Sequence, residues 1–156
     1  MPADQLAELI EVKAEVARRI AATYGYISFY EHGRAGHCSA NAECNHFHLH
    51  ALPVTCSIVE PLAVRYRRMP LTNYGAITDT FERFGDYLYF EDTRGAMSFF
   101  PATSTVESHL LRTLIASAIG APDRANWEEM RDPAMVDTAR TRLEPTDEHR
   151  ARQLSR

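Results

Sequence analysis

The run from His46 to Leu52 constrains the fold more than any other part of the chain. Its sequence, His-Phe-His-Leu-His-Ala-Leu, alternates polar with apolar residues at a period of two. That is the side-chain period of a β-strand and not of a helix. A strand from about His46 to Thr55 would place all three histidines on one face and apolar residues on the other. Unsatisfied imidazoles are costly to bury, so the strict spacing favours a functional row over a structural one.

Helical and extended patterns precede this run. Apolar residues recur at steps of three and four over residues 4–24, which predicts an amphipathic helix. The aromatic and β-branched residues 26–30 predict a strand, and the glycine, serine and asparagine of residues 31–45 predict a loop. Residues 57–85 are interrupted by prolines and glycine and give no clear pattern.

The second half of the chain shows clearer signals. Residues 87–100 predict a hairpin, with Asp-Thr-Arg-Gly as its turn. Ser104 and Glu107 match a capping box, which predicts the start of a helix. An Asp-Pro pair predicts the N-cap and first residue of another helix, over residues 133–143. Residues 144–156 are polar and charged and are expected to form a C-terminal tail.

Length and element order together indicate the fold class. The 156 residues suit one domain, which we expect to span residues 1–143. Hairpin-connected strands with helices at both ends predict an α+β domain with a mainly antiparallel sheet and flanking helices.

Composition excludes several classes of protein. The net charge of −4 disfavours a nucleic-acid-coating surface. No stretch approaches the roughly 18 apolar residues of a membrane helix, and the N-terminus lacks the features of a secretion signal. Three cysteines are an odd number, which argues against a disulfide framework. We therefore expect a cytoplasmic protein that binds neither nucleic acid nor membrane.

Three imidazoles in a row form a hydrogen-bonding surface that titrates near physiological pH. Two chemistries suit such a surface. In the first, one imidazole attacks phosphorus while its neighbours position it and contact phosphate oxygens. In the second, the ring nitrogens bind a metal ion. The residues alone leave both open.

The histidine row also carries a family resemblance. His46–Leu52 resembles the signature of the histidine triad superfamily, His-φ-His-φ-His-φ-φ with φ apolar. Phe29–Gly33, a strand ending in a glycine turn, is similar to the segment that precedes the histidines in that family. Tyr87–Glu91 and Glu107–Arg112 resemble a bacterial branch related to dinucleoside polyphosphate hydrolases.

The resemblance implies a histidine-triad-like fold and nucleotide chemistry. In that family the middle histidine attacks the α-phosphorus of a nucleotide ester, anhydride or phosphoramidate. A nucleotidyl-histidine forms, and water or another acceptor then resolves it. By position, His48 would be the nucleophile, His50 would contact a phosphate oxygen, and His46 would orient the row. The resemblance implies no required cofactor, although a divalent ion such as Mg²⁺ or Zn²⁺ can accompany a polyphosphate.

Five further residues are candidates for substrate binding. Glu31 and Gly33 lie in the glycine turn, where many family members have Asn in place of the glutamate. Asn45 offers a neutral donor just before the histidines, where the family commonly has Gly-Gln-Ser. His109 and Arg112 lie one turn apart at a predicted helix start and could reach a phosphate; a solvated helix face is the alternative.

One departure from the family and one cluster of zinc donors leave alternatives open. Few residues precede the first strand, whereas family members have additional strands there that form much of the nucleoside pocket. Another chain could complete the pocket, which favours a homodimer; otherwise the pocket is open or the chain is trimmed. Zinc donors also cluster within ten residues, although no Cys-x-x-Cys pair is present, so small buried thiols are the simpler interpretation. These donors are His37, Cys38, Cys44 and His46.

The sequence therefore predicts a nucleotide hydrolase or nucleotidyltransferase whose partner is a small-molecule nucleotide. Two rival functions remain. One is a non-catalytic nucleotide-binding module that retains the histidines. The other is a metal-dependent enzyme that uses them as ligands.

Overall fold

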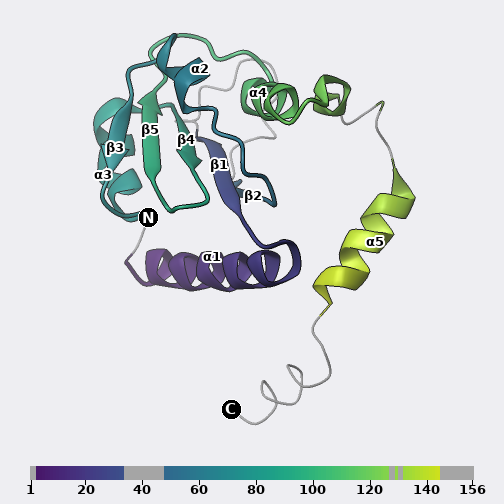
Figure 1. The fold of residues 1–156 in the computed structure, drawn as a ribbon. Coiled ribbons are helices and arrows are strands. Elements are labelled where there is room, and N and C mark those ends of the chain that lie inside the picture. The colour runs from purple at the N-terminus through teal and green to yellow at the C-terminus, as the bar shows by residue number, and fades with distance from the viewer. Residues whose placement is uncertain (1–2, 34–47, 127–128, 130–131, 145–156) are drawn as a thin grey trace.

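The computed structural model describes residues 3–33, 48–126, 129 and 132–144. They form an α+β fold, which confirms the predicted class (Figure 1). In chain order the elements are α1 (Ala3–Tyr24), β1 (Ser28–Gly33), β2 (His50–Leu52), α2 (Val59–Ala63), β3 (Met69–Leu71), α3 (Ala76–Phe84), β4 (Tyr87–Glu91), β5 (Met97–Pro101), α4 (Leu110–Ala118), the 3₁₀ helix η1 (Pro122–Ala125) and α5 (Pro133–Leu143).

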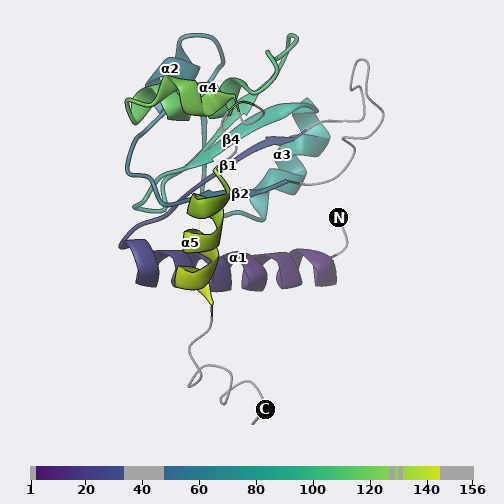
Figure 2. The ribbon, with the colours of Figure 1, turned by 90° about the vertical axis from the view of Figure 1, so that its right-hand side faces the viewer.

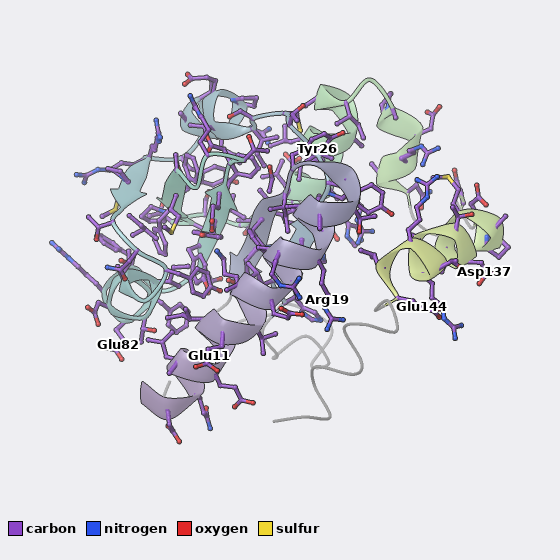
Figure 3. All side chains as sticks on the ribbon, turned by 60° about the horizontal axis from the view of Figure 1, so that its bottom comes forward. Glu11, Arg19, Tyr26, Glu82, Asp137 and Glu144 are labelled. Atoms are coloured by element: carbon purple, nitrogen blue, oxygen red, sulfur yellow. The ribbon has the colours of Figure 1, made fainter. Side chains whose placement is uncertain are left out.

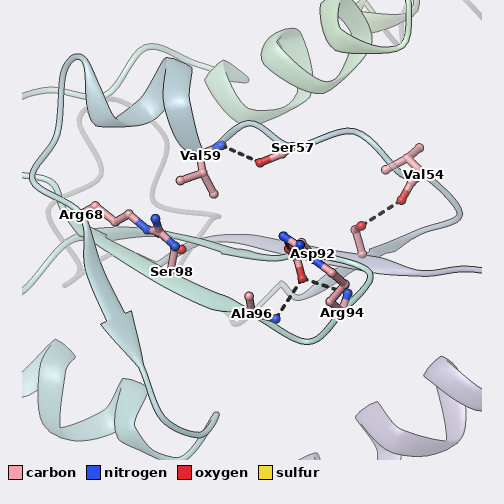
Figure 4. Close-up of polar contacts among 9 residues, drawn as sticks. Val54, Ser57, Val59, Arg68, Asp92, Arg94, Ala96 and Ser98 are labelled. Atoms are coloured by element: carbon pink, nitrogen blue, oxygen red, sulfur yellow. Dashed lines mark hydrogen bonds and ion pairs between the residues drawn. The ribbon is translucent and has the colours of Figure 1, made fainter.

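The described strands form one antiparallel sheet in the order β2-β1-β4-β5-β3. β4 lies at its centre between β1 and β5, and β2 and β3 lie at its edges. β3 contains Pro70, which cannot donate to a ladder and is therefore tolerated on an edge strand. The Ser28 hydroxyl donates to the Val54 carbonyl at 2.9 Å, which ties β1 to the segment that follows β2 (Figure 4).

The sheet lies between α1 on one side and α2 and α4 on the other (Figure 2). Side chains alternate between these faces along each strand. One core packs under α2 and α4 and includes Tyr30, Leu88, Phe90 and Phe100. The other packs under α1 and α3 and includes Phe29, Tyr87, Tyr89 and Phe99. Residues 87–90 are all buried between these two layers of helices.

Charged side chains cover the outer sides of the helices. Glu11 on α1, Glu82 on α3 and Asp137 on α5 are exposed and point away from the sheet (Figure 3). Within the part of the chain that the structure describes, no helix has both the length and the apolar character needed to cross a bilayer.

Three local predictions are confirmed. The first helix spans α1. The hairpin is β4–β5, and its turn is held by the Asp92 carboxylate, which accepts from the backbone N–H groups of Arg94 and Ala96 at 2.9 Å each (Figure 4). The last helix is α5, where the Asp132 side chain caps the N-terminus by accepting from the Met135 N–H at 3.0 Å.

The capping-box prediction is wrong. The helix begins at Leu110, and Ser104 lies outside it. The Glu107 carboxylate instead accepts from the Arg65 guanidinium at 3.0 Å. Val106 is buried in the core under α2 and α4. The residues just before α4 therefore follow a non-helical path that places the Val106 side chain in this core.

Two predicted boundaries also change. The loop expected from Glu31 begins later, because residues 31–33 continue β1 and pair with residues 87–89 of β4. The strand expected over residues 46–55 is regular over His50–Leu52 alone among its described residues. Its first two residues lie outside the described part of the chain. The segment 57–85, which gave no pattern, contains α2, β3 and α3.

Candidate functional site

Two elements bring His50 against Tyr30. In the antiparallel pairing of β1 with β2, Tyr30 lies directly opposite His50, so both side chains project from the same face of the sheet. Their rings stack, with centroids 4.4 Å apart and planes 7° from parallel. Tyr30 is buried and His50 is half-buried. Stacking on this buried ring therefore restricts the orientation of the imidazole.

His48 continues the row on this face. The ring centroids of His48 and His50 are 6.3 Å apart, and the ring planes differ by 19°. This spacing matches the roughly 6.5 Å that separates alternate side chains of a strand. Leu49 and Ala51 pack in the core under α1 and α3, as the alternation predicts. His48 is exposed, so the row runs from the protein interior toward solvent.

Arg112 of α4 supplies positive charge to the same face. Its guanidinium lies close enough to Tyr30 and His50 for its charge to act on both. The Nη1 atom of Arg112 is buried and makes no hydrogen bond within the described residues. Arg112, Tyr30, His50 and His48 thus form one cluster contributed by three segments of the chain.

The environment sets the protonation of this cluster. Burial lowers the pKa of His50, and the charges of Arg112 and His48 lower it further. The imidazole of His50 is consequently neutral near pH 7. Burial also raises the pKa of Tyr30, although the Arg112 charge opposes the increase. The Tyr30 hydroxyl consequently keeps its proton.

The structure does not bring Glu31 to the histidines. Because side chains alternate along β1, Glu31 projects from the opposite face to Tyr30 and His50. It is 2% exposed. Burial raises its pKa to about 7, and the polar hydroxyl of Tyr87 opposes this increase. The Oε2 atom of Glu31 is buried without a partner in the described structure.

Gly33 is also directed away from the histidines by the same alternation. A Cβ at this position would collide with the Tyr87 ring. The glycine therefore permits a close approach between β1 and an aromatic side chain of β4, which is a packing role.

His109 lies at the N-cap of α4, three residues before Arg112. Its side chain is exposed, and its backbone is in the left-handed region at φ 60°. The remaining candidates, Asn45 and His46, lie outside the described residues, as do His37, Cys38 and Cys44. Among the residues that are described, no group of three or more His, Cys, Asp or Glu could hold a metal ion.

Sequence reasoning missed Tyr30 as a site residue. The period of two places it on one face of a strand, but the sequence does not show which strand pairs with which, or in what register. The Tyr30–His50 stack depends on that register, so only the assembled sheet reveals it.

A second polar cluster lies on the opposite face, under α1. The Lys13 ammonium pairs with the Glu91 carboxylate at 2.6 Å, and the Tyr89 hydroxyl donates to the same carboxylate oxygen at 2.5 Å. Lys13 also lies over the Phe29 and Tyr74 rings, 4.3 and 5.2 Å from their centroids. A cavity of about 220 Å³ borders this cluster, between α1 and the turn after β4.

No model of a known protein family matches the chain, and no curated protein matches it.

Proposed function

We propose that this chain is a histidine-triad-like nucleotide hydrolase or nucleotidyltransferase that acts at the α-phosphate of a nucleoside phosphate derivative through His48. The observation that carries the proposal is the placement of two nearly parallel imidazoles in one row, beside an arginine, Arg112, whose charge acts on His50 and whose Nη1 atom is buried. Nucleophilic rings next to a fixed cation suit attack on an electrophile that carries negative charge.

In the proposed reaction a neutral His48 ring nitrogen attacks the α-phosphorus. A P–N bond forms as the bond from phosphorus to the leaving group breaks, giving a nucleotidyl-histidine. Water then attacks the same phosphorus and releases a nucleoside monophosphate, or another acceptor takes the nucleotidyl group. The exposure of His48 supports its role as the nucleophile, since a substrate can reach it from solvent.

His50 and Arg112 would stabilise the charge on the phosphoryl oxygens. The neutral His50 ring can donate one hydrogen bond, and the guanidinium donates several while remaining charged. His109, exposed one turn before Arg112, could contact a more distal phosphate. The roles of His46 and Asn45, orienting the row and donating to the phosphate, continue to rest on the family resemblance.

The proposed substrates are dinucleoside polyphosphates, nucleotide sugars and phosphoramidates. No cofactor is needed for attack by an imidazole, and a divalent ion would accompany a polyphosphate as its counter-ion. We further propose a cytoplasmic homodimer, in which a second copy completes the nucleoside pocket.

One observation favours a second candidate, a nucleotide-binding module without turnover. Glu31 and Gly33, two of the candidates for substrate binding, lie on the wrong face of the sheet to meet a ligand at the histidines. A site that lacks these contacts can bind the phosphates of a nucleotide without orienting its α-phosphorus for attack.

The test uses nucleotides labelled at the α-phosphate, with adenine, guanine, uracil and cytosine as bases. The wild-type chain should form an acid-labile adduct on the peptide that contains His48, detected by mass spectrometry. His48→Ala should lose the adduct and turnover while still binding nucleotide. His149→Ala, which removes a histidine outside the row, is the matched control. Nucleotide binding without adduct or product for any base would favour the binding module.

A further inference from the structure

We propose that the Tyr30 hydroxyl and the Arg112 guanidinium form a two-donor receptor for a phosphoryl oxygen beside His50. The inference rests on the proposed function and deepens it, because it adds Tyr30 to the groups that contact the substrate. It also identifies the recognised part of the substrate as an anionic phosphoryl group and not the nucleoside.

The hydroxyl of Tyr30 can donate a hydrogen bond to a ligand. A phenol has one O–H donor and also accepts. The positive charge of Arg112 acts on this hydroxyl, and a nearby guanidinium cannot accept its proton, so the O–H remains a donor. Because the hydroxyl is buried, it stays protonated beside the guanidinium. The pair therefore offers an O–H and several N–H groups at one place on the histidine face.

The Nη1 atom of Arg112 is buried and has no hydrogen-bond partner in the described structure. A buried charged donor without a partner is costly, and an anionic oxygen offsets that cost well. The planar fork of a guanidinium matches the geometry of a phosphate, which can accept two parallel N–H groups. The unpartnered atom thus indicates an anion as the ligand.

Tyr30 and Arg112 lie on the same face of the sheet as the proposed nucleophile, His48. The Tyr30 ring stacks on His50 at 4.4 Å, and the His48 ring lies 6.3 Å farther along the row. An oxygen bound by Tyr30 and Arg112 would lie on the same face as His48. Binding the anion would therefore hold its phosphorus next to the attacking ring.

The test measures binding of inorganic pyrophosphate by calorimetry, which does not depend on turnover. Tyr30→Phe keeps the stacked ring and removes the donor, so the affinity should fall about tenfold, the usual effect of losing one hydrogen bond to a charged group. Arg112→Gln should lower the affinity more than Tyr30→Phe does. Arg112→Lys should restore part of the affinity, because it keeps the charge without the fork.

Tyr66→Phe is the matched control. Tyr66 is a buried tyrosine of the same core, so losing its hydroxyl tests for a general effect on packing. This variant should bind pyrophosphate as the wild type does. Unchanged binding by Tyr30→Phe, or an equal loss in Tyr66→Phe, would overturn the inference. Thermal unfolding of each variant confirms that it is folded.

The two proposals fail separately. His48→Ala should still bind pyrophosphate, because the receptor does not include that ring. A Tyr30-dependent affinity in a chain that never forms an adduct would uphold the receptor and reject nucleotidyl transfer. An adduct at His48 whose formation is the same in Tyr30→Phe would uphold the transfer and reject the receptor.

Discussion

Lys13 of α1 and Glu91 of β4 form an ion pair of 2.6 Å that is largely shielded from water, with side chains 13% and 12% exposed. The pair anchors the N-terminal helix to a central strand. The Glu91 oxygen that accepts from Lys13 also accepts from the Tyr89 hydroxyl. The carboxylate is therefore held from two directions, beneath a helix that covers the face opposite the histidines.

Removing one partner of this pair should be strongly destabilising. Lys13→Met leaves a carboxylate in a poorly hydrated site, for which we expect a loss of about 3 kcal/mol in the free energy of unfolding. Urea titration measures it. The double variant Lys13→Met/Glu91→Gln should recover part of the loss, because it removes the uncompensated charge. A double variant that is less stable than Lys13→Met would contradict this explanation.

Glu31 should make stability depend on pH. Its folded-state pKa is raised from 4.5 to about 7, so the folded chain binds the proton more tightly than the unfolded chain. Protonation of Glu31 therefore adds about 3 kcal/mol to the free energy of unfolding. This contribution is fully present below pH 4.5 and is lost as pH rises to about 7. Glu31→Gln should lack this loss. Urea titrations at pH 4 to 8 measure the free energy of unfolding of both proteins. If it changes with pH in the same way in both, Glu31 is not the source of the pH dependence.

Arg112 should control the protonation of His50. Burial and the Arg112 charge lower the pKa of this imidazole, in that order of size. Arg112→Gln should therefore raise the His50 pKa, while burial keeps it below the ordinary value. Titration of the ring resonances by nuclear magnetic resonance measures the shift. Arg65→Gln, which removes an arginine paired with Glu107, should leave it unchanged. An unmoved His50 pKa in Arg112→Gln would show that the guanidinium does not act on this ring.

Local signals in the sequence predicted local structure well. The first helix, the β4–β5 hairpin and the Asp132 cap depend on residues close together in the chain, so periodicity and capping rules identify them. Within residues 57–85, α2 and β3 were missed because they have five and three residues, too few to establish a period.

Predictions that needed distant partners fared differently. The capping box failed because Val106 inserts into the core, and Glu107 pairs instead with Arg65, which lies 42 residues earlier in the chain. The histidine alternation correctly placed His48 and His50 on one face. It could not show that Glu31 would face the other way, because that depends on how β1 and β2 align. Tyr30 was missed for the same reason.

The place of β2 in the sheet has a further consequence. Among the strands that the structure describes, β2 is bonded along one side, through three residue pairs with β1, whereas β4 has neighbours on both sides. The backbone of β2, which carries His50, can therefore separate from β1 while the inner strands remain paired. This local opening costs less free energy than global unfolding. Warming should thus abolish the histidine arrangement before the molecule melts, and amide hydrogen exchange should be faster at Ala51 than at Tyr89.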